Sequence, residues 1–273
     1  MKNIKDSFVY MYKNILYLFL LSVLPAVFIG TLLSPFKFIE FINNYPKLAI
    51  SKFGDIFYSV VDISWLKLLF YVLAIVILSI FISLILGMIE NHFRSGKRNI
   101  KNFKGFINNN IMNVFINLTM LFIIYFLVSF LCATFIYLFH ILVSGIGSTP
   151  NVFSIIIASL FVVIYFCLSV GFSLISFLNI PNMLINGYNF KNSLGGVFNL
   201  LYKNPVELLV GMLIPYVIII PTISLTVNSK LIILFNILGV LICLIYYSSF
   251  IMVSYFSLSN LNRYDNRRYY NIK

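Results

Sequence analysis

The stretch from Tyr12 to Ser34, YKNILYLFLLSVLPAVFIGTLLS, decides the fold, because a Tyr-Lys-Asn triplet leads directly into a long apolar run. A run of about 20 apolar residues crosses the hydrocarbon core of a bilayer as a helix. The same arrangement returns from Tyr202 to Thr226, YKNPVELLVGMLIPYVIIIPTISLT. A proline, Pro25 or Pro215, stands eleven residues after the Asn in each stretch. We interpret the two stretches as copies of one unit, an interfacial helix that feeds a membrane span.

Composition places the whole chain in the same class. It is 61% hydrophobic and only 10% charged, with a mean hydropathy of +1.01. Backbone groups in lipid must pair within their own segment, and the apolar runs show no period-two alternation, so helices are predicted rather than a β-barrel. We therefore predict an all-α polytopic protein with a single membrane domain over 1–273 and a short basic tail over 259–273. The six expected spans lie near 15–34, 65–89, 111–144, 152–180, 205–226 and 231–257.

A short basic, amphipathic stretch ending in Asn precedes three of these runs, at 4–14, 100–110 and 190–204. In the first stretch the apolar residues recur at helical spacing between the charged ones, as expected for a helix lying in a membrane interface. These stripe residues are Ile4, Phe8, Met11, Tyr12 and Ile15. The pattern predicts three helical hairpins, each preceded by an interfacial helix on the inner face.

The placement of Lys and Arg predicts the orientation. With six spans, fourteen of the 19 basic residues fall on the side of both termini and five on the other side. Loops rich in Lys and Arg stay in the cytoplasm, so both termini are expected there, with the protein in the bacterial cytoplasmic membrane. The net charge of +12 then reflects topology and contact with anionic lipid, and no nucleic-acid partner is predicted because no soluble basic domain is present.

The inner segment 90–110 is the most basic part of the chain. Each Lys or Arg near a membrane surface contributes about 1 kcal/mol of attraction to anionic lipid. One interpretation is a site for anionic lipid, for a cytoplasmic partner or for a separate ATPase. The other is that these charges only fix the topology. The residues expected to make the contact are Arg94, Lys97, Arg98, Lys101 and Lys104.

The predicted spans contain few groups that ionise. His140 and Glu207 both fall near span ends, and no paired acid and base or His-Glu ligand cluster is visible. Enzymes and proton-coupled carriers place such groups at depth, so we predict a non-enzymatic protein without catalytic residues, metal or cofactor. The Ser, Thr and Asn residues inside the spans are expected to hold helices together.

Two further features leave alternatives open. Pro25 and Pro215 are predicted to kink their helices near mid-bilayer, either around a central cavity or simply for packing. The outer segment 35–64 contains a predicted amphipathic helix, which is either a lid, a docking surface or a helix resting on lipid. Its apolar face comprises Phe53, Ile56, Phe57, Val60 and Val61.

Two motifs carry a resemblance that covers residues 70–225. The first is Arg94-Ser95-Gly96-Lys97 followed by Phe103-Lys104-Gly105-Phe106 and Asn110. The second is Phe177-Leu178-Asn179-Ile180-Pro181, then Ser193 and Leu201-Tyr202-Lys203-Asn204. The pattern resembles a loose group of uncharacterised bacterial six-span proteins related to the membrane domain of some glycerophosphodiester phosphodiesterases. No phosphodiesterase catalytic domain is present, so the resemblance implies an architecture and lipid-related or accessory work.

The sequence thus predicts a lipid-associated or scaffolding membrane protein. Six spans, an N-terminal interfacial helix and a basic inner loop also resemble the membrane subunit of an ATP-driven exporter or self-immunity system. In that alternative, 90–110 is the coupling segment. The ATPase must then be a separate polypeptide, because the chain has no Walker motif.

Overall fold

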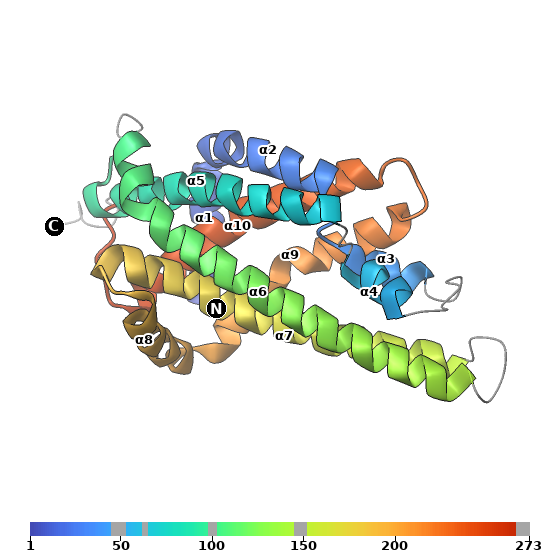
Figure 1. Cartoon of the computed structure of the whole chain (residues 1–273). Coiled ribbons are helices and arrows are strands. Elements are labelled where there is room, and N and C mark those ends of the chain that lie inside the picture. Colours follow the sequence, from blue (N-terminus) through green and yellow to red (C-terminus); the bar gives the residue numbers. More distant parts are fainter. Residues whose placement is uncertain (45–52, 62–64, 98–102, 145–151, 266–273) are drawn as a thin grey trace.

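The computed structural model describes residues 1–44, 53–61, 65–97, 103–144 and 152–265. Helices account for nearly all of these ranges, and none of the described residues forms a strand (Figure 1). Predicted sites at 98–102, including Arg98 and Lys101, and most of the basic tail lie outside the described residues. The all-α prediction is confirmed.

Six helices are long and apolar enough to cross a membrane, which supports a multi-pass membrane protein. All six predicted spans are recovered, although α5 and α7 each continue about six residues past their apolar runs. These six helices are α2 (Ile15–Leu32), α5 (Trp65–Ser95), α6 (Phe103–Ser144), α7 (Val152–Asn186), α9 (Pro205–Thr226) and α10 (Ile232–Leu258).

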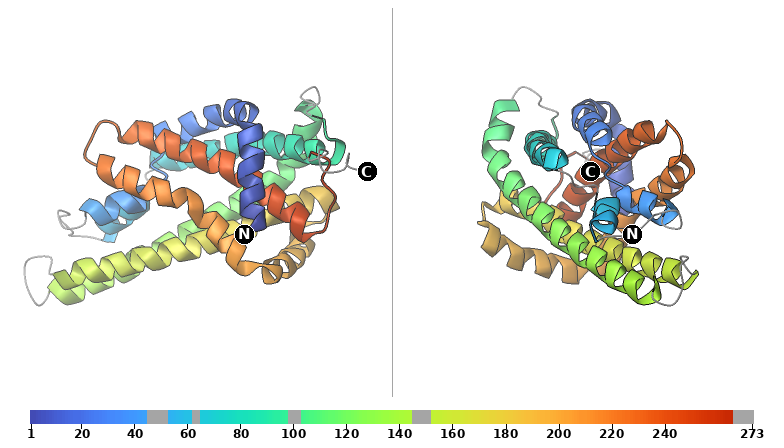
Figure 2. Two further views of the ribbon diagram at one scale, coloured as in Figure 1. Left: turned by 180° about the vertical axis from the view of Figure 1, so that it is seen from behind. Right: turned by 45° about the vertical axis from the view of Figure 1, so that its right-hand side comes forward.

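Two of the three predicted interfacial helices are separate elements, α1 (Lys2–Lys13) and α8 (Phe190–Lys203). Each ends at its Asn, where the backbone leaves the helical region with φ of −123° at Asn14 and −155° at Asn204. Proline occupies the first position of α9, where its missing N–H costs nothing. In the left view of Figure 2, α1 runs across α10 rather than along it, as an interfacial helix should.

The structure differs from the prediction at the second unit, because residues 103–110 form the first turns of α6 and no separate helix. Asn110 stays helical and buried, and its side-chain amide donates to the Ser83 carbonyl of α5 at 3.4 Å. No proline follows Asn110 to break the helix. At 1.5 Å per residue, the 42 residues of α6 span roughly 63 Å, about twice a bilayer core. The α6–α7 pair accordingly extends beyond the other helices (Figure 1).

Helix α10 forms the centre of the bundle, and every residue from Ile245 to Phe256 is buried. It contacts α1, α2, α5, α7 and α9. Glycines permit two of these close approaches. A Cβ added at Gly30 of α2 would lie 2.6 Å from the Ile237 backbone, and one at Gly211 of α9 would collide with the Phe250 ring. Small residues therefore set how closely α2 and α9 approach α10.

The two short helices α3 (Lys37–Asn44) and α4 (Phe53–Val61) lie at the end of the bundle opposite α8 (Figure 1). Ile56 and Val60 of α4 are almost fully buried, and Phe57 makes edge contacts with Phe126 and Phe130 of α6. The predicted amphipathic helix is present as α4, and Ile56, Phe57 and Val60 of its apolar face pack against the bundle.

Candidate functional site

We call the end of the bundle that carries α1, α8, the last turn of α5 and the first turns of α6 the basic end (Figure 1). The described part of this end contains four acidic residues, and none of them is fully exposed. Glu90, Glu207 and Asp265 form ion pairs, and Asp6 is half-buried. The surface at this end is therefore positive. The exposed basic residues that form it are Lys2, Lys5, Lys13, Arg94, Lys97, Lys104, Lys191 and Lys203.

Three of the five predicted contact residues fall in this surface. Arg94 is 54% exposed while its Nε lies 2.9 Å from a Glu90 carboxylate oxygen one turn earlier. Lys97 and Lys104 are both exposed. Helix α5 ends at Ser95, and the next residue, Gly96, has a φ of +68° that suits glycine and donates its N–H to the His92 carbonyl at 2.9 Å. Arg94 therefore lies in the last turn of α5, Lys97 just after that helix, and Lys104 in the first turn of α6.

Glu207 anchors α1 to the basic end. Its Oε1 accepts the backbone N–H of Asn3 at 2.7 Å and that of Ile4 at 3.4 Å, and lies 3.2 Å from the N-terminal ammonium of Met1. The carboxylate, 5% exposed, satisfies N–H groups that have no partner within α1. The Asn204 amide donates to its other oxygen at 2.5 Å. The sequence indicated only a first-turn acid of α9, since nothing local marks a partner some 200 positions away.

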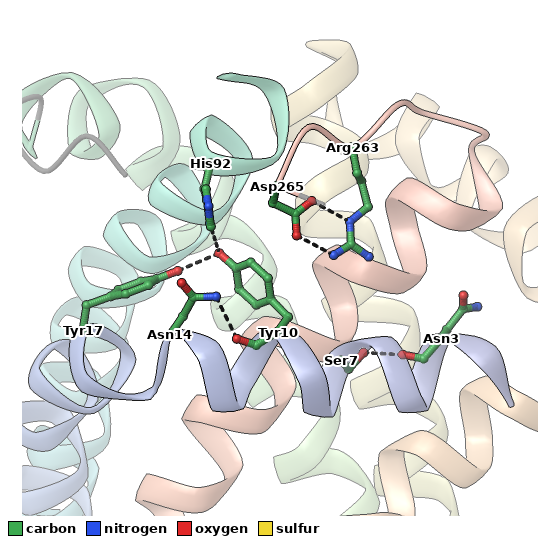
Figure 3. A network of polar contacts seen from close by, with 8 residues as sticks. All are labelled: Asn3, Ser7, Tyr10, Asn14, Tyr17, His92, Arg263 and Asp265. Carbon is green, nitrogen blue, oxygen red and sulfur yellow. Dashed lines mark hydrogen bonds and ion pairs between the residues drawn. The ribbon is translucent and has the colours of Figure 1, made fainter. Parts of the chain in front are cut away.

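A second set of contacts joins α1 to α2 and α5, and α5 in turn contacts the segment after α10 (Figure 3). The Tyr10 hydroxyl lies 2.6 Å from the Tyr17 hydroxyl and 3.1 Å from His92 Nδ1. Burial, followed by the interaction with Tyr17, raises the pKa of the Tyr10 phenol. Arg263 pairs with Asp265 at 2.8 Å, and its guanidinium stands 4.2 Å from the centre of the Phe93 ring. Sequence reasoning missed this network because its members come from three distant segments.

Buried amides join α6, α7 and α8, as predicted for polar residues inside spans. Asn179 donates to Asn117 Oδ1 at 2.9 Å. Asn182 donates to the Ser193 carbonyl at 2.8 Å and to the Ser193 hydroxyl at 3.0 Å, while it accepts from the Tyr255 hydroxyl at 3.0 Å. The Ser193 hydroxyl also donates to the Asn179 carbonyl at 3.5 Å, so these two residues of the second sequence motif meet where α8 docks on α7.

A cavity of about 260 Å³ lies inside the bundle between α2, α5, α7, α9 and α10. Its lining is mainly apolar, with hydroxyls from Ser173, Tyr216 and Ser248. Both predicted kink residues, Pro25 and Pro215, are buried near this cavity. Ile29, four residues after Pro25, and Tyr216, the residue after Pro215, both line it. The prolines themselves do not line the cavity, and the predicted kinks stay a prediction. This space suits a small amphipathic molecule rather than an ion.

Within the described ranges, no group of three His, Cys, Asp or Glu side chains could hold a metal ion. No family model, curated protein or solved structure matches the chain. The resemblance to the membrane domain of glycerophosphodiester phosphodiesterases therefore stays a prediction.

Proposed function

We propose that this is a non-enzymatic protein of the bacterial cytoplasmic membrane whose basic end faces the cytoplasm and engages anionic lipid headgroups. The observation that carries the proposal is the charge of that end. Its exposed charged side chains are all basic among the described residues, whereas its acids are buried, half-buried or paired. Anionic headgroups attract such a surface, and the attraction falls off within a Debye length of the membrane.

The interfacial helices support this role. Helix α1 carries exposed Phe8 and Tyr12 on one side and exposed Lys2 and Lys13 on another, so apolar groups can enter the bilayer while amines remain at headgroup level. Glu207 and Tyr10 hold this helix against the bundle, which fixes its charged side relative to the spans. Without these contacts, the lysines of α1 would not keep a fixed position relative to the spans.

The test replaces all five predicted residues, Arg94, Lys97, Arg98, Lys101 and Lys104, by Gln in one variant. The protein is reconstituted in phosphatidylcholine nanodiscs and mixed with phosphatidylglycerol vesicles, and co-flotation is measured. We expect a loss of at least tenfold in apparent affinity for the five-fold variant, and unchanged binding for a control with Lys67 and Lys230 replaced at the other end. Full retention of binding by a normally inserted five-fold variant would contradict the proposal and leave these charges as a topology signal.

A second candidate is the membrane subunit of an ATP-driven exporter or self-immunity system, with the ATPase on another polypeptide. The cavity lined by residues of five spans favours it, because a substrate needs a place inside the bundle. In this case the exposed turn at Arg94 and Lys97 forms the contact with the ATPase. Purification in mild detergent together with an ATPase, and its loss in the five-fold variant, would support the exporter over the lipid-associated role.

A further inference from the structure

A small polar pocket lies at the basic end, between α1, the last turn of α5 and the chain that follows α10. Tyr10 and Asn14 line it from the side of α1, and His92 lines it from α5. The chain after α10 contributes the paired side chains of Arg263 and Asp265 (Figure 3). The volume of the pocket is about 70 Å³, far below the roughly 300 Å³ at which sites for small organic molecules begin.

The side chain of Asn14 brings an acceptor to this pocket that lacks a donor. Asn14 is 4% exposed, and its Oδ1 has no hydrogen-bond partner among the described residues. The orientation of the amide is fixed, because Nδ2 donates to the Tyr10 carbonyl at 2.7 Å and a flip would bring two oxygens together. Nor does this side chain cap α2, which begins at the next residue. Buried polar atoms are almost always hydrogen-bonded, so Oδ1 requires a donor from within the pocket.

The formal charges around the pocket cancel. Asp6 and Asp265 are acidic, while Lys13 and Arg263 are basic. A bound anion would lie near two carboxylates and a bound cation near two basic groups, so an ion of either sign meets repulsion. The lining instead suits a small neutral molecule that both donates and accepts hydrogen bonds. Water has this chemistry, and bridging waters are nearly as favourable in enthalpy as direct hydrogen bonds.

We propose that the pocket holds a cluster of ordered water molecules, one of which donates a hydrogen bond to Asn14 Oδ1. One buried water needs about 10 to 15 Å³, so a pocket of about 70 Å³ has room for more than one. Buried waters typically make about three hydrogen bonds each, and the Asp6 carboxylate and the Tyr10 hydroxyl line the same space. The cluster joins the end of α1 to α5 and to the chain after α10.

This inference goes beyond the lipid-associated role, because it concerns how α1 is held and not what the basic end binds. Glu207 holds the first residues of α1 through the N–H groups of Asn3 and Ile4. The pocket lies at the other end of the same helix, beside Asn14. Helix α1 is thus attached by a carboxylate at its start and by water at its end.

Radiolytic hydroxyl-radical labelling of the full chain in detergent tests for the water. Radicals formed from water modify the side chains beside it, so a buried tyrosine is labelled only where water reaches it. Tyr10 is 3% exposed, and Tyr165, inside the span α7, is 2% exposed and serves as the internal control. We expect Tyr10 to be labelled at least fivefold faster than Tyr165. Equal rates for the two tyrosines would overturn the proposal.

Two variants of Asn14 connect the labelling to this pocket. Asn14→Leu replaces the acceptor by an apolar group of similar size, and we expect the labelling rate of Tyr10 to fall at least threefold. Asn14→Asp keeps an oxygen acceptor and should leave the rate unchanged, which makes it the matched control. An unchanged rate in a folded Asn14→Leu would overturn the proposal. If Asn14→Leu does not fold, Val9→Phe at the exposed rim fills the pocket and must give the same fall.

A high-resolution crystal structure of the wild type, from crystals soaked in a thallium(I) salt, identifies the occupant directly. We expect water density within about 3.2 Å of Asn14 Oδ1 and no anomalous signal at that position. An anomalous peak there would show a monovalent cation in place of water and would overturn the proposal. A pocket without density beside Oδ1 would also overturn it.

Discussion

The side chain of Glu207 and the backbone N–H of Asn3 form a hydrogen bond of 2.7 Å across 204 positions of sequence. Glu207 lies in the first turn of α9, so one carboxylate is placed at the N-terminal ends of two helices, α9 and α1. Both helix dipoles favour a negative charge at this point. The contact therefore links the interfacial helix directly to the start of a membrane span.

Removal of this carboxylate should release α1. We expect Glu207→Ala to lower the free energy of unfolding by roughly 1 to 3 kcal/mol, since buried N–H groups lose a charged acceptor. Thermal unfolding in detergent measures the loss, and limited proteolysis should cut within α1 faster than in the wild type. Glu40→Ala, which removes an acid from α3 at the other end, serves as control. Equal proteolysis of α1 in all three proteins would show that Glu207 does not hold it.

Tyr10 should make stability depend on alkaline pH. Its pKa is raised in the fold above the ordinary value of 10.0, so the folded protein keeps the phenol neutral where the unfolded chain ionises it. This contribution is complete below pH 10 and declines as pH rises toward the raised value. We expect Tyr10→Phe to unfold at a lower temperature at neutral pH, with the difference from wild type narrowing above pH 10. A difference that stays constant through this range would contradict the assignment.

Gly30 should be intolerant of even a methyl group. The Cβ of Gly30→Ala would meet the backbone of Ile237, which cannot rotate away, so α2 and α10 must separate. Overpacking of this kind costs about 1 to 3 kcal/mol. Gly195→Ala on the open side of α8 is the matched substitution and should change the unfolding temperature little. Comparable unfolding temperatures for the two variants would show that α2 does not approach α10 this closely.

Asn182 should determine whether α8 stays docked. Asn182→Ala removes both donated hydrogen bonds to Ser193 and the carbonyl oxygen that accepts from the Tyr255 hydroxyl, so Tyr255 keeps only the bond donated by Asn186. We expect a loss of roughly 2 to 4 kcal/mol, combining an unsatisfied network with a small cavity. Exposed Asn108→Ala on α6 is the control. Thermal unfolding gives the magnitude, and cysteine accessibility at Ser193→Cys should rise only when Asn182 is replaced.

The orientation can be read by labelling single cysteines in cells after Cys132, Cys167 and Cys243 are replaced by serine. A membrane-impermeant maleimide added from outside should reach cysteines introduced at 50, 147 and 227. Cysteines at 97 and 268 should stay unlabelled until the membrane is opened. Labelling of position 97 in intact cells would reverse the predicted topology and remove the basis for cytoplasmic lipid contact.

The local sequence determined the class and the element order. Six runs of sufficient length and apolarity must become helices in lipid, because unpaired backbone groups there cost too much. The breaks at Asn14 and Asn204 were also readable, from a repeated triplet and, in the second case, a following proline. Asn110 looked equivalent, yet the helix continues through it. The side chain of Asn110 donates to the Ser83 carbonyl of α5, a tertiary contact that the repeated pattern does not reveal.

Only the tertiary structure decided what the polar residues do. Glu207, Tyr10 and Asn182 owe their roles to partners 7 to 204 positions away, and apolar periodicity carries no information about such pairings. The central place of α10 was equally hidden, because its mean hydropathy of 2.2 is close to the 2.3 to 3.1 of the other five spans. In a water-soluble protein, buried positions are mostly apolar and exposed positions mostly polar, so the sequence pattern shows which residues form the core. In a bilayer both environments are apolar, so a lipid-facing side chain and a core side chain look alike until the helices are packed.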